Sequence, residues 1–518
     1  MTHLRTSLIA VAAVFFLLTA WYGRPAGLWN SPDETANAFW AERVAHGQPL
    51  TFRDAIVGLG AGAIHPRSMA VSDNALIPGS FSGLILLYGA LRLITKVPLF
   101  LFTPIFTLVA GVFFGVIIGR LFDRRVGVLS ALLFFLHPAV LYYGARGLFH
   151  NLLFIDLLIL SVACFVCKQD RAGDALGGFL FGWAILTRAS EAVWAVPAFL
   201  LFLPLAGARR WRRLGWALVG VAVPLFLFLQ TNASLYGSPL TTPYVAPPAP
   251  VTIASDASEI SAPSAPAHVL PFGFDARRAL RNAWEYGLRL FWWQSLLAVS
   301  GLILWCVSFR KATTAQKIYA LAALLTAVWL AVLYGSWAVR DRLDPSHVTI
   351  GTSYVRYFLP AYVAMLPFGA LALVRFGDRL KKSYVVPAAI ALIGLLTVHA
   401  TIFAGDESLR AVRATLAQNV AKQKVLLSIF PQETVIMTER FDKLFVPHRL
   451  RIIPTADEAG FQAAAIAALH APVYWYGLTP SAAELGRLES LAFANDLIFA
   501  LRESPIPGET MMWLIYGE

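Results

Sequence analysis

Two adjacent carboxylates are the residues of this sequence whose chemistry is easiest to name. They belong to Ser31-Pro32-Asp33-Glu34, which comes shortly after an apolar run over 6–22. A carboxylate where a membrane segment meets water could act as a general base toward an arriving hydroxyl, or as a metal ligand. The same residues also favour a helix start, with Ser31 as N-cap, Pro32 in the first turn and Glu34 closing a capping box. Both interpretations can hold, because a cap also fixes the geometry of Asp33.

Arginines near the ends of apolar runs form a second group that could do chemistry. Arg356 lies beside Tyr354 and Tyr357 at the start of one run, and Arg188 lies in a very short turn with Glu191. A guanidinium can contact two phosphate oxygens at once, so both arginines are candidates for holding a lipid phosphate. Two simpler alternatives stay open. Arg356 could anchor lipid headgroups, and Arg188 could pair with Glu191 along a helix.

Other polar residues carry weaker signals. Arg146 resembles the two arginines above, and His150 follows it by one helical turn. A histidine in that setting is more typical of interface packing than of a general base. The sequon at Asn232 occurs easily by chance, and His65 is expected at the surface of a long loop. The cysteines lie inside apolar runs and make no metal-binding or redox pattern; they are Cys164, Cys167 and Cys306.

The composition requires that lipid replaces water around much of the chain. Of the 518 residues, 58% are hydrophobic and only 14% are charged, whereas soluble domains carry about 25% charged residues. This excludes a soluble enzyme, a disordered protein and a fibrous repeat, since too few polar side chains exist to cover a surface in water. The net charge of +12 does not indicate nucleic acid as a partner, because cytoplasmic loops of membrane proteins collect basic residues.

Eleven apolar runs of the sequence approach the length of about 20 residues that a membrane-spanning helix needs. A further run over 78–95 is short and is closed by Arg92 and Lys96. If it does not span, seventeen basic residues fall in the loops predicted inside and five in the short loops outside, as the positive-inside rule requires. We therefore predict that 78–95 is interfacial or re-entrant, with a cytoplasmic N-terminus and an outer C-terminus. The eleven runs are 6–22, 98–119, 126–144, 151–168, 173–189, 191–206, 214–231, 286–308, 318–337, 355–375 and 384–403.

The predicted fold is an all-α polytopic membrane domain over 1–404, followed by a small α/β domain over 405–518 on the outer face. Two outer loops belong to the membrane domain. The first, 23–97, is expected to hold amphipathic helices. The second, 232–285, is rich in Pro, Ala and Ser around 243–267 and is expected to be mobile there. Alternating segments define the last domain, with strands at 434–439, 473–478, 497–502 and 511–516 and helices at 407–428, 456–470 and 480–494.

Five motifs in order resemble the GT-C superfamily of polytopic glycosyltransferases, and within it the protein O-mannosyltransferase and aminoarabinose transferase clan. Together they cover roughly residues 7–400, and all are predicted to lie on the outer face. Each motif is weak alone, whereas their order is moderately specific. The motifs are a first span followed by DETANAFWAERVAHGQPL; His137-Pro138 with Tyr142, Tyr143 and Arg146; GWAILTRASEAVWAVPAFLLFLP; Asn232 with Tyr236-Gly237-Ser238-Pro239-Leu240; and GTSYVRYFLPAYVAMLP.

The resemblance implies a sugar donor linked to a polyprenyl phosphate, transfer on the non-cytoplasmic side, and inversion at the anomeric carbon. It implies a multi-pass protein of the plasma membrane, such as the bacterial inner membrane, in contact with membrane lipids. The acceptor would be a lipid, a glycan or a protein. Asp33 would be the catalytic base or its close partner, and Glu34 a supporting carboxylate. The candidate substrate-binding residues are Arg146, His150, Arg188, Asn232, Tyr354 and Arg356.

Two departures from the clan's pattern bear on the site. The clan's "HPP" in the first outer loop reads His65-Pro66-Arg67 here, so the wall on the substrate side is altered. Where related enzymes often place an acidic residue after the tyrosine pair, this chain has His150-Asn151. A second metal-binding acid is therefore absent, and the sequence leaves open whether a divalent cation such as Mg²⁺ or Mn²⁺ takes part.

Two other classes of function compete with an enzyme. A transporter or flippase for a lipid-linked glycan predicts charged residues in the middle of spans, lining a path. Asp156 is the clearest such charge, and it has no basic partner nearby in sequence. A receptor-like assembly protein is a third interpretation, although eleven spans are more than an anchor needs. The polar groups cluster outside, and an outer domain follows the last span, which favours surface chemistry.

Overall fold

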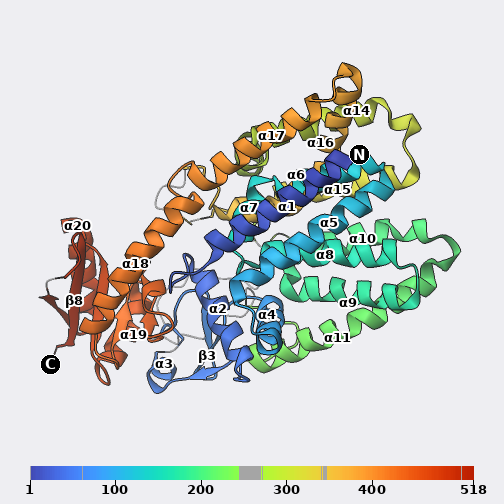
Figure 1. The fold of residues 1–518 in the computed structure, drawn as a ribbon. Coiled ribbons are helices and arrows are strands. Elements are labelled where there is room, and N and C mark those ends of the chain that lie inside the picture. The colour runs from blue at the N-terminus through green and yellow to red at the C-terminus, as the bar shows by residue number, and fades with distance from the viewer. Residues whose placement is uncertain are drawn as a thin grey trace. The chain divides into compact units, whose positions relative to one another are not determined.

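The computed structural model describes residues 2–60, 62–243, 270, 272–339, 341, 347–502 and 504–517, and Figure 1 shows its fold. The chain divides into two compact units, each assembled from separate parts. Unit 1 comprises Met1–Arg24, Phe100–Phe226 and Asp256–Val412; unit 2 comprises Pro25–Leu99, Leu227–Ser255 and Arg413–Glu518. The domain boundary expected between 404 and 405 stays a prediction. Of the expected mobile stretch 243–267, only residue 243 lies among the described residues.

Unit 1 is a bundle of apolar helices, and α5, α8 and α9 run side by side in it (Figure 1). Close approach depends on small residues. At Gly301, for example, an added Cβ atom would lie 1.7 Å from the carbonyl oxygen of Phe368, so only glycine lets α14 meet α16 there. The helices are α1 (Thr2–Gly23), α5 (Phe102–Leu121), α6 (Arg124–Phe135), α7 (Pro138–Ala145), α8 (His150–Cys167), α9 (Arg171–Thr187), α10 (Ala192–Leu201), α11 (Arg210–Tyr236, in unit 1 up to Phe226), α13 (Ala276–Asn282), α14 (Trp292–Val307), α15 (Thr314–Leu333), α16 (Ser353–Leu380), α17 (Val385–Val398) and α18 (Leu409–Ile429, in unit 1 up to Val412).

Short helical turns connect several of these helices. They are the 3-10 turns η1 (Leu99–Leu101), η2 (Ala189–Glu191), η3 (Leu203–Arg209) and η5 (Phe309–Lys311), and the π-helical turns η4 (Ala283–Arg289) and η6 (His399–Phe403). Because such turns change the direction of the backbone or the pitch of the helix, they mark the places where the chain departs from straight spans.

Seven helices in the described part of the chain are long and apolar enough to cross a membrane, and three bent pairs raise the number to as many as ten. Eleven runs were expected. The difference is that the runs 173–189 and 191–206 correspond to one pair, in which α9 and the following helical segment are bent by 114°. The short run 78–95 forms a helix of 14 residues, α4 (Ser82–Thr95), below the length of a span. The chain is thus an integral, multi-pass membrane protein.

Unit 2 contains two sheets. The first is small and antiparallel, in the order β1-β3-β2, and the second has five strands in the order β5-β4-β6-β8-β7, parallel over β5-β4-β6 and antiparallel over β6-β8-β7. Figure 1 shows the larger sheet in orange and red with α19 and α20. The helices are α2 (Pro32–Ala45), α3 (Ala55–Leu59), α4, α19 (Glu458–Ala468) and α20 (Ala482–Ala494), with the turn η7 (Asp442–Leu444); the strands are β1 (Phe52–Arg53), β2 (Met69–Ser72), β3 (Ala75–Pro78), β4 (Val435–Met437), β5 (Ile452–Ile453), β6 (Val473–Leu478), β7 (Leu497–Arg502) and β8 (Glu509–Tyr516).

One hydrophobic core joins the first loop of unit 2 to its C-terminal sheet. Buried Trp40 of α2 and Ile85 of α4 belong to the same cluster as Met437 of β4 and Phe461 of α19. The expected α/β tail is confirmed, because runs rich in strand-forming side chains specify β6, β7 and β8 locally. Strand β5 was missed, since two residues carry no periodicity. The core thereby holds α2, whose first turn bears the two carboxylates, against the tail.

Candidate active site

The start of α2 separates the roles of its two carboxylates. Ser31 has the extended backbone of an N-cap, and its Oγ accepts a hydrogen bond from the Glu34 backbone N–H at 3.1 Å. In return Glu34 Oε2 accepts from the Ser31 N–H at 3.1 Å, which completes the predicted capping box. Glu34 is 2% exposed, so its carboxylate is used to fix the helix start. Asp33, one residue earlier, is half-buried and lies on another side of the helix.

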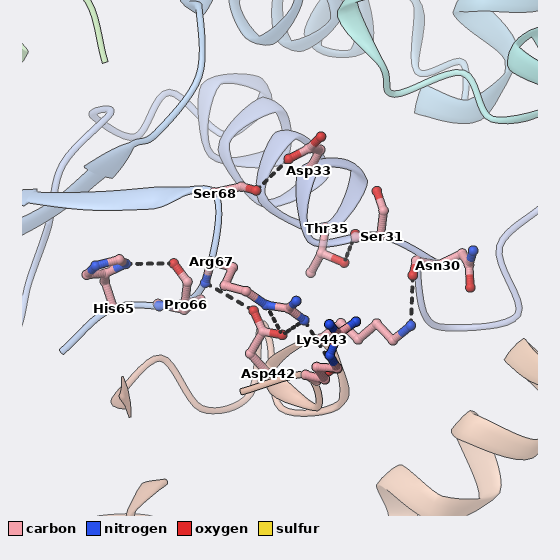
Figure 2. A network of polar contacts seen from close by, with 11 residues as sticks. Asn30, Ser31, Asp33, Thr35, His65, Pro66, Arg67, Ser68, Asp442 and Lys443 are labelled. Atoms are coloured by element: carbon pink, nitrogen blue, oxygen red, sulfur yellow. Dashed lines mark hydrogen bonds and ion pairs between the residues drawn. The ribbon is translucent and has the colours of Figure 1, made fainter. Parts of the chain in front are cut away.

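Ser68 contacts the Asp33 carboxylate directly. Figure 2 shows the two side chains pointing toward each other, and Ser68 Oγ donates to Asp33 Oδ1 at 2.5 Å. Ser68 stands just before β2 and has a left-handed backbone with φ +62°, which is uncommon for a residue other than glycine. No sequence pattern singles out Ser68, because 35 residues separate it from Asp33.

The residue before Ser68 joins this loop to the C-terminal tail. Arg67 donates from its backbone N–H to Asp442 Oδ2 at 3.0 Å and from its Nε to Asp442 Oδ1 at 3.0 Å. Its Nη2 lies 2.5 Å from the same Oδ1 and also donates to the Arg440 carbonyl at 3.0 Å. Asp442 is 1% exposed, and the next residue, Lys443, donates to the Asn30 carbonyl at 2.9 Å (Figure 2). Asp442 had not been singled out from the sequence.

His65 lies in the same loop but is not a surface residue as expected. It is half-buried, and its Nδ1 is 2.9 Å from the Pro66 carbonyl oxygen (Figure 2). Burial lowers the pKa of His65, and the nearby Pro66 carbonyl and Asp442 offset this only in part. The loop folds inward because Arg67 is drawn to Asp442, which takes the neighbouring imidazole out of water.

In unit 1, aromatic rings bring together the three arginines predicted from the sequence. The guanidinium carbon of Arg356 is 4.5 Å from the ring centre of Phe149, and that of Arg146 is 4.9 Å from the same ring. The guanidinium carbon of Arg356 also lies 5.2 Å from the ring centre of Tyr357, and the guanidinium carbon of Arg188 lies 5.2 Å from the same ring centre. The three cations are thus connected through two shared rings, with geometry in the range of cation–π interactions.

Polar contacts distinguish these three arginines. Arg356 donates from Nη2 to Ser353 Oγ at 2.8 Å, and Arg146 from Nη1 to the Tyr142 hydroxyl at 3.1 Å. Arg188 instead forms the expected ion pair, with Nη2 2.8 Å from Glu191 Oε1, and both side chains are almost fully buried. Glu191 neutralises Arg188 locally, so a phosphate at Arg188 would compete with this ion pair.

Glu191 has two further donors, which complete this buried network. The Tyr334 hydroxyl donates to Oε1 at 2.6 Å, and Trp194 Nε1 donates to Oε2. The Arg188 guanidinium also donates to the Tyr334 oxygen at 3.0 Å. Buried charges are tolerated when such partners satisfy them, so the network stabilises the bend between α9 and α10.

The remaining candidates have separate positions. His150 is the first residue of α8 and is buried, and its neighbour Asn151 donates to the Arg356 carbonyl at 3.1 Å. The Tyr354 hydroxyl accepts from the Val339 N–H at 3.3 Å and donates to the Trp337 carbonyl. Asn232 belongs to unit 2, where its Nδ2 donates to the Pro239 carbonyl at 3.4 Å. The contact of Asn151 places the start of α8 beside the Arg356 segment, and the substrate-binding roles of His150, Tyr354 and Asn232 stay predictions.

No group of three or more His, Cys, Asp or Glu side chains that could hold a metal ion occurs within the residues that the structure describes. The two carboxylates of the Asp33-Glu34 pair are also engaged differently, since Glu34 closes the capping box. Whether a divalent cation such as Mg²⁺ or Mn²⁺ takes part stays a prediction.

Comparison with known proteins agrees with this architecture. Residues 84–231 match the model of the dolichyl-phosphate-mannose-protein mannosyltransferase family. Among solved structures, the Archaeoglobus fulgidus oligosaccharyltransferase tethered with an acceptor peptide containing the NVT sequon shares the fold, with a TM-score of 0.53, 11% identity, and coverage of 99% of this chain and 74% of that chain. No curated protein sequence matches the chain.

Two further structures share the fold. AglB from Archaeoglobus fulgidus, in complex with an inhibitory peptide and a dolichol-phosphate, has a TM-score of 0.53 and 12% identity over 98% of this chain and 74% of that chain. ArnT from Cupriavidus metallidurans in the apo state has a TM-score of 0.50 and 14% identity over 99% of this chain and 98% of that chain. These structures share the fold of a polytopic membrane protein. The family model matches residues 84–231, over α4 to α11, and agrees with the resemblance to the GT-C superfamily.

Proposed function

We propose that this protein transfers a sugar from a polyprenyl-phosphate donor to a hydroxyl of an acceptor on the non-cytoplasmic face of the membrane. The observation that carries the proposal is the Asp33 carboxylate, held by Ser68 at the first turn of α2 while Glu34 closes the cap. A carboxylate with its own hydrogen-bond donor is oriented for general-base catalysis. The dolichol-phosphate bound to AglB supports a polyprenyl-phosphate donor.

In the proposed reaction, the acceptor oxygen attacks the anomeric carbon while Asp33 takes the proton of the attacking hydroxyl. The bond between the anomeric carbon and the phosphate oxygen breaks, and its electron pair leaves with the polyprenyl phosphate. Attack opposite to the leaving group inverts the anomeric centre. We assign the binding of the donor phosphate to Arg356, because a guanidinium can contact two phosphate oxygens.

The arginine assignment has a physical basis in unit 1. Arg356 is held from two sides by Phe149 and Tyr357, at 4.5 and 5.2 Å, so its guanidinium loses little further freedom on binding an anion. Arg146 shares the Phe149 ring and adds a second positive charge. A divalent cation would supply Lewis-acid neutralisation of the phosphate, but the described residues contain no group of three or more His, Cys, Asp or Glu side chains to hold it, and no step is assigned to it. The acceptor class, whether lipid, glycan or protein, stays a prediction.

The proposal is tested by measuring covalent transfer of labelled sugar from a panel of polyprenyl-phosphate donors in membranes that carry the protein. Asp33→Asn should lower the rate by about 10²–10⁴-fold, the usual range for loss of a general base. The matched control is Asp73→Asn, which removes an exposed carboxylate from the turn between β2 and β3 in the same unit. Asn tolerates the left-handed backbone of that turn, so the control should keep the wild-type rate. Full activity of Asp33→Asn would overturn the assignment.

The alternative, a transporter or flippase of lipid-linked glycans, predicts charges along a path through the spans. Asp156, the clearest candidate, is 0% exposed and accepts a hydrogen bond from Thr107 Oγ1 at 2.6 Å. This contact joins α8 to α5 and is suited to helix packing. Movement of labelled lipid-linked sugar across vesicles without covalent transfer would favour the alternative over the enzyme.

A further inference from the structure

We infer that the C-terminal tail positions the catalytic carboxylate, through a chain of contacts from Asp442 to Arg67, Ser68 and Asp33 (Figure 2). This gives the segment 405–518 a role in catalysis that its sequence does not reveal. The inference rests on the proposed function of Asp33. Asp442, Arg67 and Ser68 are positioning residues, because they act on the reaction only through the orientation of the base.

The first step of the chain is an ion pair with several hydrogen bonds, in which the Asp442 side chain is buried and the Arg67 side chain is 33% exposed. Asp442 accepts from both the backbone N–H and the Nε of Arg67, each at 3.0 Å, and its side chain is 2% exposed. A contact that engages a side chain and its own backbone fixes the loop in rotation as well as in position. The 375 residues between the partners mean that only the folded tail can supply this carboxylate.

The second step is the backbone of Ser68, directly after Arg67. Its left-handed conformation, φ +62°, costs free energy and persists only where neighbours determine it. The Arg67–Asp442 pair holds the loop from one side. From the other side the Gly79 N–H donates to the Ser68 carbonyl at 3.1 Å, and a Cβ atom at Gly79 would lie 2.7 Å from the Ser68 carbonyl carbon. Ser68 is thus held between the tail and the end of β3.

The third step is the hydrogen bond from Ser68 Oγ to Asp33 Oδ1 at 2.5 Å. A strong donor at this distance fixes the rotation of the carboxylate. Asp33 itself is anchored by the capped start of α2, and Trp40 of α2 shares its hydrophobic core with Met437 of the tail. The helix that carries the proposed base and the tail that orients it therefore share one hydrophobic core.

The sequence departure at 65–67 fits this role. The clan's second proline is Arg67 here, and a proline could donate neither from a backbone N–H nor from a side chain. The arginine thus supplies all three Arg67 donors that Asp442 accepts, the backbone N–H, Nε and Nη2. We read it as the addition of a tail contact at the loop that carries Ser68.

The test uses the full-length protein in membranes and measures kcat, KM for the donor and the pH profile. The main variant is Ser68→Gly, which keeps the left-handed backbone without strain and removes the hydroxyl. We expect kcat to fall about tenfold with KM unchanged within about twofold. The acid limb of the kcat profile should shift to higher pH, since the carboxylate loses a donor that favours its charged form.

The tail link is tested by Asp442→Asn and Arg67→Gln, which should change kcat and the pH profile in the same direction as Ser68→Gly. The double variant Asp442→Asn/Ser68→Gly should have a kcat no lower than that of Ser68→Gly alone, because the effects of residues that act through one chain of contacts are not additive.

The matched control is Arg451→Gln. Arg451 also ties the tail to the first loop, with its Nε 3.0 Å from Asp54 Oδ2 and similar burial, but it does not lead to Asp33, so kcat per folded molecule should stay at wild type.

The outcomes separate the two proposals. If Asp33→Asn is inactive while Ser68→Gly keeps the wild-type kcat and pH profile, the positioning chain is wrong and the base assignment stands. If Asp442→Asn and Arg451→Gln lower activity equally, and only in proportion to lost folded protein, the tail has a structural role alone. Full activity of Asp33→Asn overturns the proposed function itself. Where Asp442→Asn does not fold, Ser68→Gly decides, because it removes no core contact.

Discussion

The carboxylate region of unit 2 and the arginine region of unit 1 are constructed in opposite ways. Asp33 is oriented by directional hydrogen bonds, from the capping box at Ser31 to the donor at Ser68. Arg356 and Arg146 are instead held over the faces of aromatic rings, with Phe149 between them. Hydrogen bonds weaken steeply with angle, whereas attraction to a ring face tolerates small displacements.

This difference suits the two proposed tasks. A general base must meet one proton at one position, so small misplacement is costly. A ligand for a phosphate that leaves during the reaction must accommodate an anion that moves, so a cation on an apolar ring face serves better. We therefore expect changes in the carboxylate region to act on kcat, and changes in the arginine region to act on KM or on stability.

The largest effect is expected at Arg188, which is held by a buried ion pair as well as by an aromatic ring. Arg188 is paired with Glu191 at 2.8 Å, and the two side chains are 10% and 2% exposed. Glu191→Ala would leave a buried guanidinium without its counter-ion, which typically costs about 3–5 kcal/mol. The Tm of the detergent-solubilised protein should fall strongly.

The double variant Arg188→Met/Glu191→Leu is the control for this prediction, because replacing both charges by apolar groups can be neutral. It should recover most of the lost Tm. The Arg125–Asp378 pair, whose side chains are about half exposed, should tolerate Arg125→Met with little change. Equal shifts at the two pairs would show that burial does not govern their contribution.

The next effect tests whether the arginine region acts on binding. Arg356→Lys keeps the charge but loses the planar fork, which makes bidentate contact with phosphate impossible. We expect KM for the donor to rise about tenfold, or about 1.4 kcal/mol, with kcat within about twofold. Arg281→Lys, at an exposed position of α13, is the control and should keep the wild-type KM. A fall in kcat alone would place Arg356 in the chemical step. It would contradict the expectation that the arginine region acts on KM and the carboxylate region on kcat.

Local sequence patterns predicted the parts of both regions that are local in the chain. Ser31 to Glu34 specified the helix start of α2, and Arg188 with Glu191 specified an i,i+3 pair. The strands β6 and β7 begin and end where they were predicted, at 473–478 and 497–502, because β-branched, aromatic and aliphatic side chains are concentrated in them. In each case the partners lie within one element or one turn.

Contacts between distant segments could not be predicted. Ser68 lies 35 residues from Asp33, and Asp442 lies 375 residues from Arg67, so no periodicity connects them. The one signal in the sequence was a departure from the clan's pattern, because Arg67 stands where that pattern has a proline. The shared ring of Phe149 was missed for the same reason, because nothing in a single sequence places Phe149 between two arginines.

A smaller effect on stability should reveal the buried loop of the carboxylate region. Burial lowers the pKa of His65 below its unfolded value of about 6.5. The unfolded chain therefore binds more protons than the folded one as the pH falls through this range, so stability is full above pH 6.5 and decreases on acidification. The free energy of unfolding of the wild type should decrease between pH 7 and pH 5 by at most about 1.4 kcal/mol per pH unit. The Tm should fall with it, and His65→Gln should flatten this dependence. His470→Gln, at an exposed position after α19, should keep the wild-type profile.

The smallest effect distinguishes two neighbouring carboxylates that a sequence cannot separate. Glu34 Oε2 accepts from the Ser31 N–H at 3.1 Å, and glutamine can make the same contact in a capping box. Glu34→Gln should therefore keep kcat within about twofold, whereas Asp33→Asn removes the proposed base. Glu34→Ala loses the cap and should lower stability by about 1 kcal/mol with a corresponding decrease in Tm. If Glu34→Gln were as inactive as Asp33→Asn, Glu34 would contribute its charge rather than its hydrogen bond at the helix start. Asp33 and Glu34 would then act as a pair.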